Sequence, residues 1–249
     1  MKKRNESKIT MAALMMMVAM AMTSCASSKK INGDSNASKD SEMGKNEEDL
    51  DNSYLILSDT QQDIVKKNNA FALRLFNKVI DMESKVISPM SVSYLMGMLA
   101  NGADGITQQE ILKAIGCEGV SVSDLNELYK AMLLTANKQD KQTTVNIANY
   151  IAVNKNFQLN KDFCQKVSDS YLAGIESLDF TSSKSTDRIN GWCKEKTNGM
   201  IPRIIDQVSA DAVSYLMNAI YFKGTWQNKF NAKDTKLENF RGYTRDIQK

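Results

Sequence analysis

The chain has 249 residues, a formal charge of +3 at pH 7, four Cys and no His. Without His, these residues cannot supply a Ser-His-Asp triad, a Cys-His pair or a His-ligated zinc site. Residues 1–24 carry the whole excess charge, which leaves 28 basic and 28 acidic residues in the remainder, so nothing in the charge predicts nucleic acid as a partner.

Residues 1–24 are typical of a secretory signal sequence. A basic start is followed by the uncharged run Ile9–Met22, which at about 14 residues is short for a membrane span but suits a signal peptide. The order Met22-Thr23-Ser24-Cys25 resembles a bacterial lipobox, although Leu is commoner than Met at the first position. The resemblance implies cleavage before Cys25, lipid on its thiol and an anchor in the cell envelope, exposed at the cell surface or alternatively periplasmic. An ordinary signal peptide with an incidental Cys is the alternative.

Residues 25–53 are rich in Ser, Asn, Asp, Glu and Lys and hold almost nothing apolar. Such a segment buries too little surface to offset its ordering entropy, so we expect a disordered polar tether ahead of a folded domain over 54–249.

Cysteine usage in that domain predicts no framework of disulfides. Cys117, Cys164 and Cys193 cannot all pair with one another, and no C-x-x-C motif is present. We expect small buried hydrophobic side chains, with a disulfide, a redox motif or a zinc knuckle as weaker alternatives, and we predict no metal and no cofactor.

Helices are predicted along the domain, and most of them lie in its first half. Apolar residues at helical spacing predict a helix over 61–81. Ser88 is a good N-cap and Pro89 suits a first helical position, so a second helix should run over Met90–Ala100 and, being apolar all round, should be buried. Further helices are expected from a capping box at Thr107-x-x-Glu110 to Gly116, around Leu125–Leu133, over 160–171 and over about 186–197.

The strands follow a different pattern. Alternation over Val145–Val153 predicts a strand with Asn149 in its middle, and a short strand should end near Phe180. The run Ala212–Phe222 is almost continuously apolar, as expected of a central strand covered on both faces. Asn218 interrupts this run and needs hydrogen-bond partners, unless it is solvated near the strand end. Helices first, then strands mixed with helices, predict an α+β domain around a large sheet.

Several short motifs follow one another in a fixed order. They are Ser88-Pro89-x-Ser91, Gly102-Ala103-x-Gly105-x-Thr107-x-x-Glu110, Ile147-Ala148-Asn149, Asp179-Phe180, Ile189-Asn190-x-Trp192 and Asn218-Ala219-Ile220-Tyr221-Phe222-Lys223-Gly224-x-Trp226. In this order they resemble the serpins, the serine protease inhibitor family, whose fold packs N-terminal helices on a large mixed sheet called sheet A. Two departures are Ile87, where Phe is usual, and Cys193, where Val is usual.

The resemblance implies roles for five of these residues. Ser88, Pro89, Ser91 and Asn218 would belong to the shutter, a polar cluster beneath the centre of sheet A, and the partners of Asn218 would include the two serines. Trp226 would lie at the breach, where the sheet opens to admit a strand. The alternatives are that Ser88 is only an N-cap and that Trp226 is an ordinary core residue.

The resemblance also implies a function. A serpin is not an enzyme: it inhibits serine, or alternatively cysteine, endopeptidases when a cleaved reactive loop enters sheet A as an extra strand. The partners would be the target protease and, through Cys25, a lipid membrane, and the protein would be a monomer. The alternative is a non-inhibitory serpin-like binding or chaperone lipoprotein. An envelope enzyme or glycan-binding protein is a third class, which neither a carboxylate pair nor a phosphate loop supports.

The reactive loop of the family lies well beyond the Phe240 landmark, whereas the printed chain stops at Lys249. We therefore expect these residues to be a C-terminally truncated part of a serpin domain that contains no reactive loop. Alone, they should not inhibit a protease and should fold poorly, because long apolar strands would lack neighbours.

Overall fold

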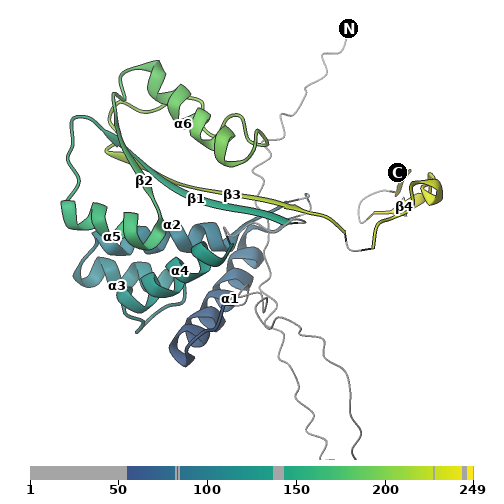
Figure 1. The fold of residues 1–249 in the computed structure, drawn as a ribbon, viewed down its shortest axis with the longest axis horizontal. Coiled ribbons are helices and arrows are strands. Elements are labelled where there is room, and N and C mark those ends of the chain that lie inside the picture. The colour runs from purple at the N-terminus through teal and green to yellow at the C-terminus, as the bar shows by residue number, and fades with distance from the viewer. Residues whose placement is uncertain are drawn as a thin grey trace, which may run out of the picture.

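The computed structural model describes residues 55–81, 83, 85–136, 143–226, 228–242 and 246–248. It has one mixed three-stranded sheet between two helical layers (Figure 1). The predicted signal sequence and tether lie outside the described residues. The helices are α1 (Asp59–Val79), α2 (Pro89–Gly102), α3 (Gly105–Ala114), α4 (Val122–Ala136), α5 (Lys161–Tyr171) and α6 (Ser183–Lys196), with a 3-10 turn at Ala232–Asp234. The strands are β1 (Thr143–Asn154), β2 (Gly174–Leu178), β3 (Ser214–Gly224), β4 (Asn239–Arg241) and β5 (Asp246–Gln248).

The starts of α1 and α2 follow from local signals. Ser58 forms a capping box with Gln61, in which each side chain bonds the other residue's backbone N–H, so α1 begins slightly before the predicted position. At α2 the prediction is confirmed: Ser88 is the N-cap and Pro89 is the first helical residue.

The predicted start of α3 is wrong. Asp104, not Thr107, is the N-cap, and its carboxylate accepts a hydrogen bond from the N–H of Gly105 at 2.7 Å. Because Asp104 satisfies an N-terminal donor first, Thr107 already lies inside the helix and cannot cap it. The predicted end is confirmed, since Gly116 has φ +77° and lets the N–H of Cys117 reach the carbonyl of Leu112 at 2.7 Å.

The sheet has the order β2-β1-β3, with β1 parallel to β2 and antiparallel to β3. The prediction that Ala212–Phe222 forms a central strand is therefore wrong for the described sheet, in which β1 is central and β3 is an edge strand. Both faces of β3 are nevertheless covered along its first half, which explains the apolar run. Leu216 and Ile220 pack on the core of α1–α5, whereas Met217 and Ala219 pack on the core beneath α6.

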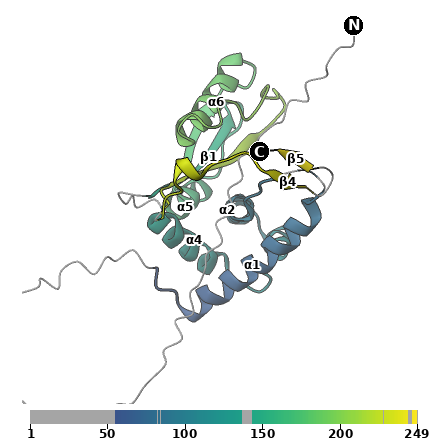
Figure 2. The same ribbon diagram turned by 90° about the vertical axis from the view of Figure 1, so that its right-hand side faces the viewer.

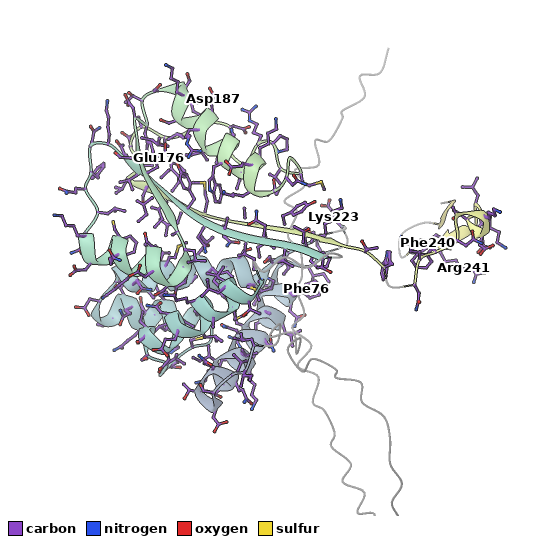
Figure 3. All side chains as sticks on the ribbon, viewed as in Figure 1. Phe76, Glu176, Asp187, Lys223, Phe240 and Arg241 are labelled. Carbon is purple, nitrogen blue, oxygen red and sulfur yellow. The ribbon has the colours of Figure 1, made fainter. Side chains whose placement is uncertain are left out.

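The two helical layers are unequal. Helices α1 to α5 lie against one face of the sheet and α6 against the other (Figures 1 and 2). The hairpin of β4 and β5 lies apart from this body, as the positions of Phe240 and Arg241 in Figure 3 show. Among the described helices, none combines the length and the apolar character that a bilayer crossing requires.

Candidate functional site

The two serines expected in the shutter form a pair at the start of α2. Ser88 Oγ accepts hydrogen bonds from the backbone N–H of Ser91 at 3.1 Å and from the Ser91 hydroxyl at 2.9 Å. Both residues are buried because Pro89 and the next turn of α2 enter the core. Two hydroxyl groups share one hydrogen bond between them, so one hydroxyl proton has no acceptor among the described contacts.

Asn218 is paired across the sheet instead. Its Nδ2 donates to Asn149 Oδ1 at 2.8 Å and to the carbonyl of Ala148 at 3.4 Å. The prediction that Asn218 bonds the serines is wrong for the described residues, because Asn149 stands directly opposite it in the antiparallel register. Asn218 Oδ1 is buried and has no hydrogen-bond partner there. A buried acceptor left unpaired costs about 1–3 kcal/mol, so this atom marks an unfinished polar cluster.

The serine pair and the asparagine pair lie on the same side of the sheet. Side chains alternate along a strand, so Asn149 and Asn218 share a face with Ile151 and Ile220, which pack against the core that contains α2. Four polar residues thus face the interior between α2 and the sheet. From the sequence, Asn149 could be identified only as a polar residue in the middle of a strand. Its cross-strand partner depends on the strand register, which neighbouring residues in the sequence do not reveal.

Trp226 lies outside the core. It follows the end of β3 by two residues, is 70% exposed, and forms an edge-to-face pair with Phe230 at 5.6 Å between ring centroids. The alternative prediction of an ordinary core residue is therefore wrong. The structure does not bring Trp226 together with the serine and asparagine pairs.

On the other face, a second set of contacts holds α6 to the sheet. Arg188 pairs with Glu176 of β2, at 2.7 Å between Nη2 and Oε2, and lies over the Tyr150 ring at 5.7 Å. The Tyr150 hydroxyl donates to the same carboxylate at 2.8 Å. Partial burial raises the pKa of Glu176, but the hydrogen bonds from Tyr150 and Arg188 outweigh it and leave the pKa below its usual value. No spacing rule predicts this contact, since the three residues lie on separate elements.

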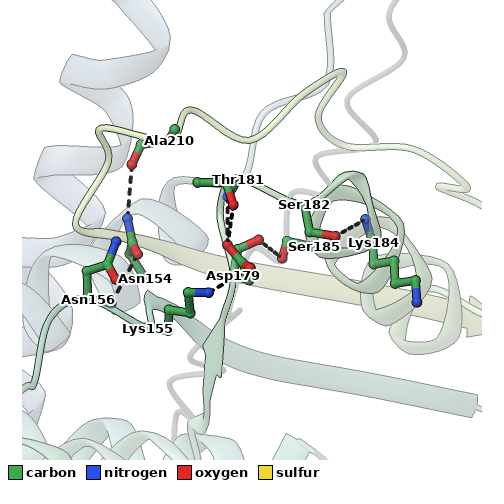
Figure 4. A network of polar contacts seen from close by, with 9 residues as sticks. All are labelled: Asn154, Lys155, Asn156, Asp179, Thr181, Ser182, Lys184, Ser185 and Ala210. Carbon is green, nitrogen blue, oxygen red and sulfur yellow. Dashed lines mark hydrogen bonds and ion pairs between the residues drawn. The ribbon is translucent and has the colours of Figure 1, made fainter.

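A polar network joins the end of β2 to the start of α6 (Figure 4). Asp179 accepts from Lys155 at 2.8 Å and from the Thr181 hydroxyl at 2.6 Å, and these contacts lower its pKa to about 2. The carbonyl of Asp179 also accepts from the Ser185 hydroxyl at 2.6 Å. This network fixes the connection that leads from the sheet into α6.

The cysteines and carboxylates of the described segments are not gathered into a second site. Cys117 and Cys193 are free and buried, as expected, and Cys164 is free and half-buried; burial raises the pKa of the Cys117 thiol to about 11. Within the described ranges no three His, Cys, Asp or Glu side chains are placed to hold a metal ion. Open hollows of about 690 Å³ beside the first turn of α6 and about 610 Å³ beside α5 are not lined by the serine and asparagine pairs.

Comparisons with known proteins agree on one family. The family model "Serpin (serine protease inhibitor)" matches residues 66–248. "Serine protease inhibitor 42Dd" of Drosophila melanogaster is 31% identical over 170 residues, which cover 67% of this chain and 46% of that protein. "Leukocyte elastase inhibitor" of Bos taurus is 33% identical over 181 residues, 70% of this chain and 47% of that protein. The thermophilic serpin tengpin in its latent state superposes with a TM-score of 0.70 at 30% identity, over 78% of this chain and 52% of that one. The chain spans about half the length of the curated relatives it matches.

Proposed function

The chain belongs to the serpin family, and from this premise we propose that the complete protein inhibits a serine, or alternatively a cysteine, endopeptidase by inserting a cleaved reactive loop into its sheet. In such a mechanism the catalytic groups belong to the protease. The serpin supplies the reactive loop that the protease cleaves and a sheet that accepts another strand. It acts as a monomer.

The open edge of β3 is the observation that carries this proposal. Among the described strands β3 pairs only with β1, so its other edge offers backbone donors and acceptors to a further strand. Side chains of the two cores cover both faces of the first half of β3. A strand added at its open edge would therefore be buried rather than solvated. A loop that enters beside β3 would satisfy these backbone groups.

The unpaired polar atoms support a shutter made of Ser88, Pro89, Ser91 and Asn218. Within the described part of the chain, one hydroxyl proton of the serine pair lacks an acceptor and Asn218 Oδ1 lacks a donor, on the same side of the sheet. A small movement of β3 relative to α2, or a donor on a further strand, would complete the cluster. Trp226, just beyond β3, is proposed as the breach residue.

We place the reactive loop in sequence that follows Lys249, since the matched relatives are about twice as long as their matched parts. The proposal predicts that the reading frame continues past Lys249 and that the added sequence supplies the remaining strands of sheet A and the loop. A stop codon directly after Lys249 would contradict it.

Covalent trapping of a protease tests the inhibitory function. The complete natural protein is incubated with trypsin, chymotrypsin, elastase and papain and then separated by denaturing electrophoresis. A complex that survives detergent with an active protease, but not with the same protease lacking its nucleophile, is the expected result. Cleavage of the loop by these proteases without any such complex would favour the non-inhibitory binding or chaperone alternative.

We also propose that the mature protein is anchored by lipid on Cys25, with the tether 25–53 holding the domain away from the membrane. Cys25 lies outside the described residues, and the proposal is supported by the lipobox-like order before it. Radioactive palmitate should label the wild-type protein in bacteria and should not label Cys25→Ala. Equal labelling of both would contradict lipid attachment, and protease treatment of whole cells separates a surface location from a periplasmic one.

A further inference from the structure

A run of three hydrogen-bonded groups links the end of α5 to Asn218. Asn149 Nδ2 donates to the backbone carbonyl of Tyr171 at 2.7 Å, and Asn149 Oδ1 accepts from Asn218 Nδ2 at 2.8 Å. Tyr171 is the last residue of α5, where carbonyls have no donor within the helix, so its oxygen is available to the sheet.

The chemistry of these groups permits only one arrangement of hydrogen-bond donors and acceptors. A carbonyl oxygen accepts and never donates, so Asn149 must present its Nδ2 to Tyr171. Asn149 Oδ1 then faces Asn218, so Asn218 must donate a hydrogen bond to it from Nδ2. Asn218 Oδ1 is therefore left as an acceptor, and among the described residues it is one of two buried side-chain atoms without a hydrogen-bond partner, the other being the Tyr94 hydroxyl oxygen.

Tyr171, whose carbonyl determines this arrangement, is itself held in place by other contacts. The Tyr171 ring is buried, and its hydroxyl donates to Asn126 Oδ1 at 2.8 Å. Asn126 and Asn101 exchange two hydrogen bonds, at 2.8 and 2.9 Å, between α4 and α2. The carbonyl of Tyr171 is thus fixed relative to α2 and α4 and provides a rigid starting point.

We propose that Asn149, oriented by the Tyr171 carbonyl, is a positioning residue that fixes the Asn218 amide in one orientation, so that the group which completes the polar cluster must be a hydrogen-bond donor. The cluster is the one on which the proposed function rests. The end of α5 thereby sets the orientation of the Asn218 amide through Asn149, although none of the hydrogen bonds described for Asn218 goes to α5 itself.

A double-mutant cycle between Asn149 and Asn218 tests this proposal. The melting temperatures of the wild type, Asn149→Ala, Asn218→Asp and the double variant are measured at pH 7 in the complete natural protein. A carboxylate at 218 would face Asn149 Oδ1, acceptor against acceptor, so Asn218→Asp should lower the melting temperature. With Asn149→Ala in the background the opposing oxygen is gone, and the decrease should be smaller by about 2 °C or more.

The sign of the coupling decides the question. If Asn149 can turn over, its Nδ2 will donate to the introduced carboxylate, and Asn149→Ala will make the decrease larger. That result, or additive effects, overturns the proposal. At a pH low enough to protonate the introduced carboxyl, its O–H can donate to Asn149 Oδ1, and the unfavourable coupling should disappear, which a purely steric effect would not do.

Two further measurements complete the design. Asn146, on the same strand, donates its Nδ2 to the carbonyl of Lys196 at 2.8 Å, so Asn146→Ala is the matched control and should be additive with Asn218→Asp. If the carboxylate variants do not fold at all, NMR of the wild type with labelled Asn decides. A coupling through the hydrogen bond between Asn149 Nδ2 and the carbonyl carbon of Tyr171 is expected, and a coupling from Asn149 Nδ2 to the side-chain carbonyl carbon of Asn218 instead would overturn the proposal. All these readouts are independent of protease inhibition, so they remain valid if the proposed function fails.

Discussion

Tyr150 of β1 stacks on Trp192 of α6, with ring centroids 5.0 Å apart and ring planes inclined by 19°. Trp192 is 5% exposed, and both rings belong to the smaller core. Buried aromatic pairs of this kind contribute both apolar area and ring–ring attraction. This stack is therefore one of the apolar contacts that hold α6 to the sheet.

Truncation of the stack should destabilise the protein strongly. Trp192→Ala removes a buried ring and leaves a cavity, so we expect a loss of about 3–5 kcal/mol in the free energy of unfolding, measured by urea denaturation. Gly191→Ala, at the exposed neighbouring position, is the control and should not destabilise. A loss below about 1 kcal/mol for Trp192→Ala would show that α6 is held mainly by other contacts.

Two glycine-to-alanine changes in helices should have opposite signs. A Cβ at Gly191 meets no atom within 4 Å, so Gly191→Ala should stabilise α6 by up to about 1 kcal/mol. A Cβ at Gly97 in α2 would collide with the Tyr171 hydroxyl and lie 3.0 Å from two ring carbons, so Gly97→Ala should destabilise by about 1–3 kcal/mol. Thermal unfolding of both variants checks this, and equal signs would contradict it.

The Asp179 carboxylate should make stability depend on pH in acid. Its pKa is lowered from 3.8 to about 2 by Lys155 and Thr181, so folding favours its ionised form. A lowered pKa gives stability that is present above about pH 4 and is lost as pH falls towards 2. In Asp179→Asn the melting temperature should fall less steeply over this range than in the wild type. Parallel profiles would contradict the contribution, and added salt should weaken it because the group is exposed.

Ser88→Ala should separate the capping role of Ser88 from its other contacts. The change removes the acceptor for the Ser91 N–H, so we expect a loss of about 0.5–2 kcal/mol in unfolding free energy. Ser88→Gly should cost only a few tenths of a kcal/mol if capping is the whole role, because glycine is tolerated at an N-cap. Equal losses for the Ala and Gly variants would show that the hydroxyl group itself is required.

Local sequence signals predicted most helix starts and ends, because a cap acts within one turn of chain. Ser88-Pro89 and Gly116 were interpreted correctly for that reason. The error at α3 has the same origin: Asp104 and Thr107 are both acceptable caps, and the choice depends on how the chain leaves α2. Local rules alone cannot rank two such candidates.

The arrangement of the sheet and the cluster depends on distant residues. The apolar run indicates that both faces of β3 are covered. It does not indicate whether another strand pairs with β3 along each of its two edges. Likewise, the pairing of Asn149 with Asn218 depends on the register between strands that are separated by two helices and another strand. The sequence therefore identified the polar residues near the sheet, while their partners required the three-dimensional structure.

The exposure of Trp226 gives the protein an optical consequence. The chain has two tryptophans: Trp192 is enclosed between α6 and the sheet, and Trp226 is in contact with water. Their emission should have two components, a blue one that iodide does not quench and a red one that it does. Any partner, strand or surface that covers the end of β3 should shift only the red component. The protein therefore carries its own fluorescent reporter for events at that end of the sheet, with an internal reference in Trp192.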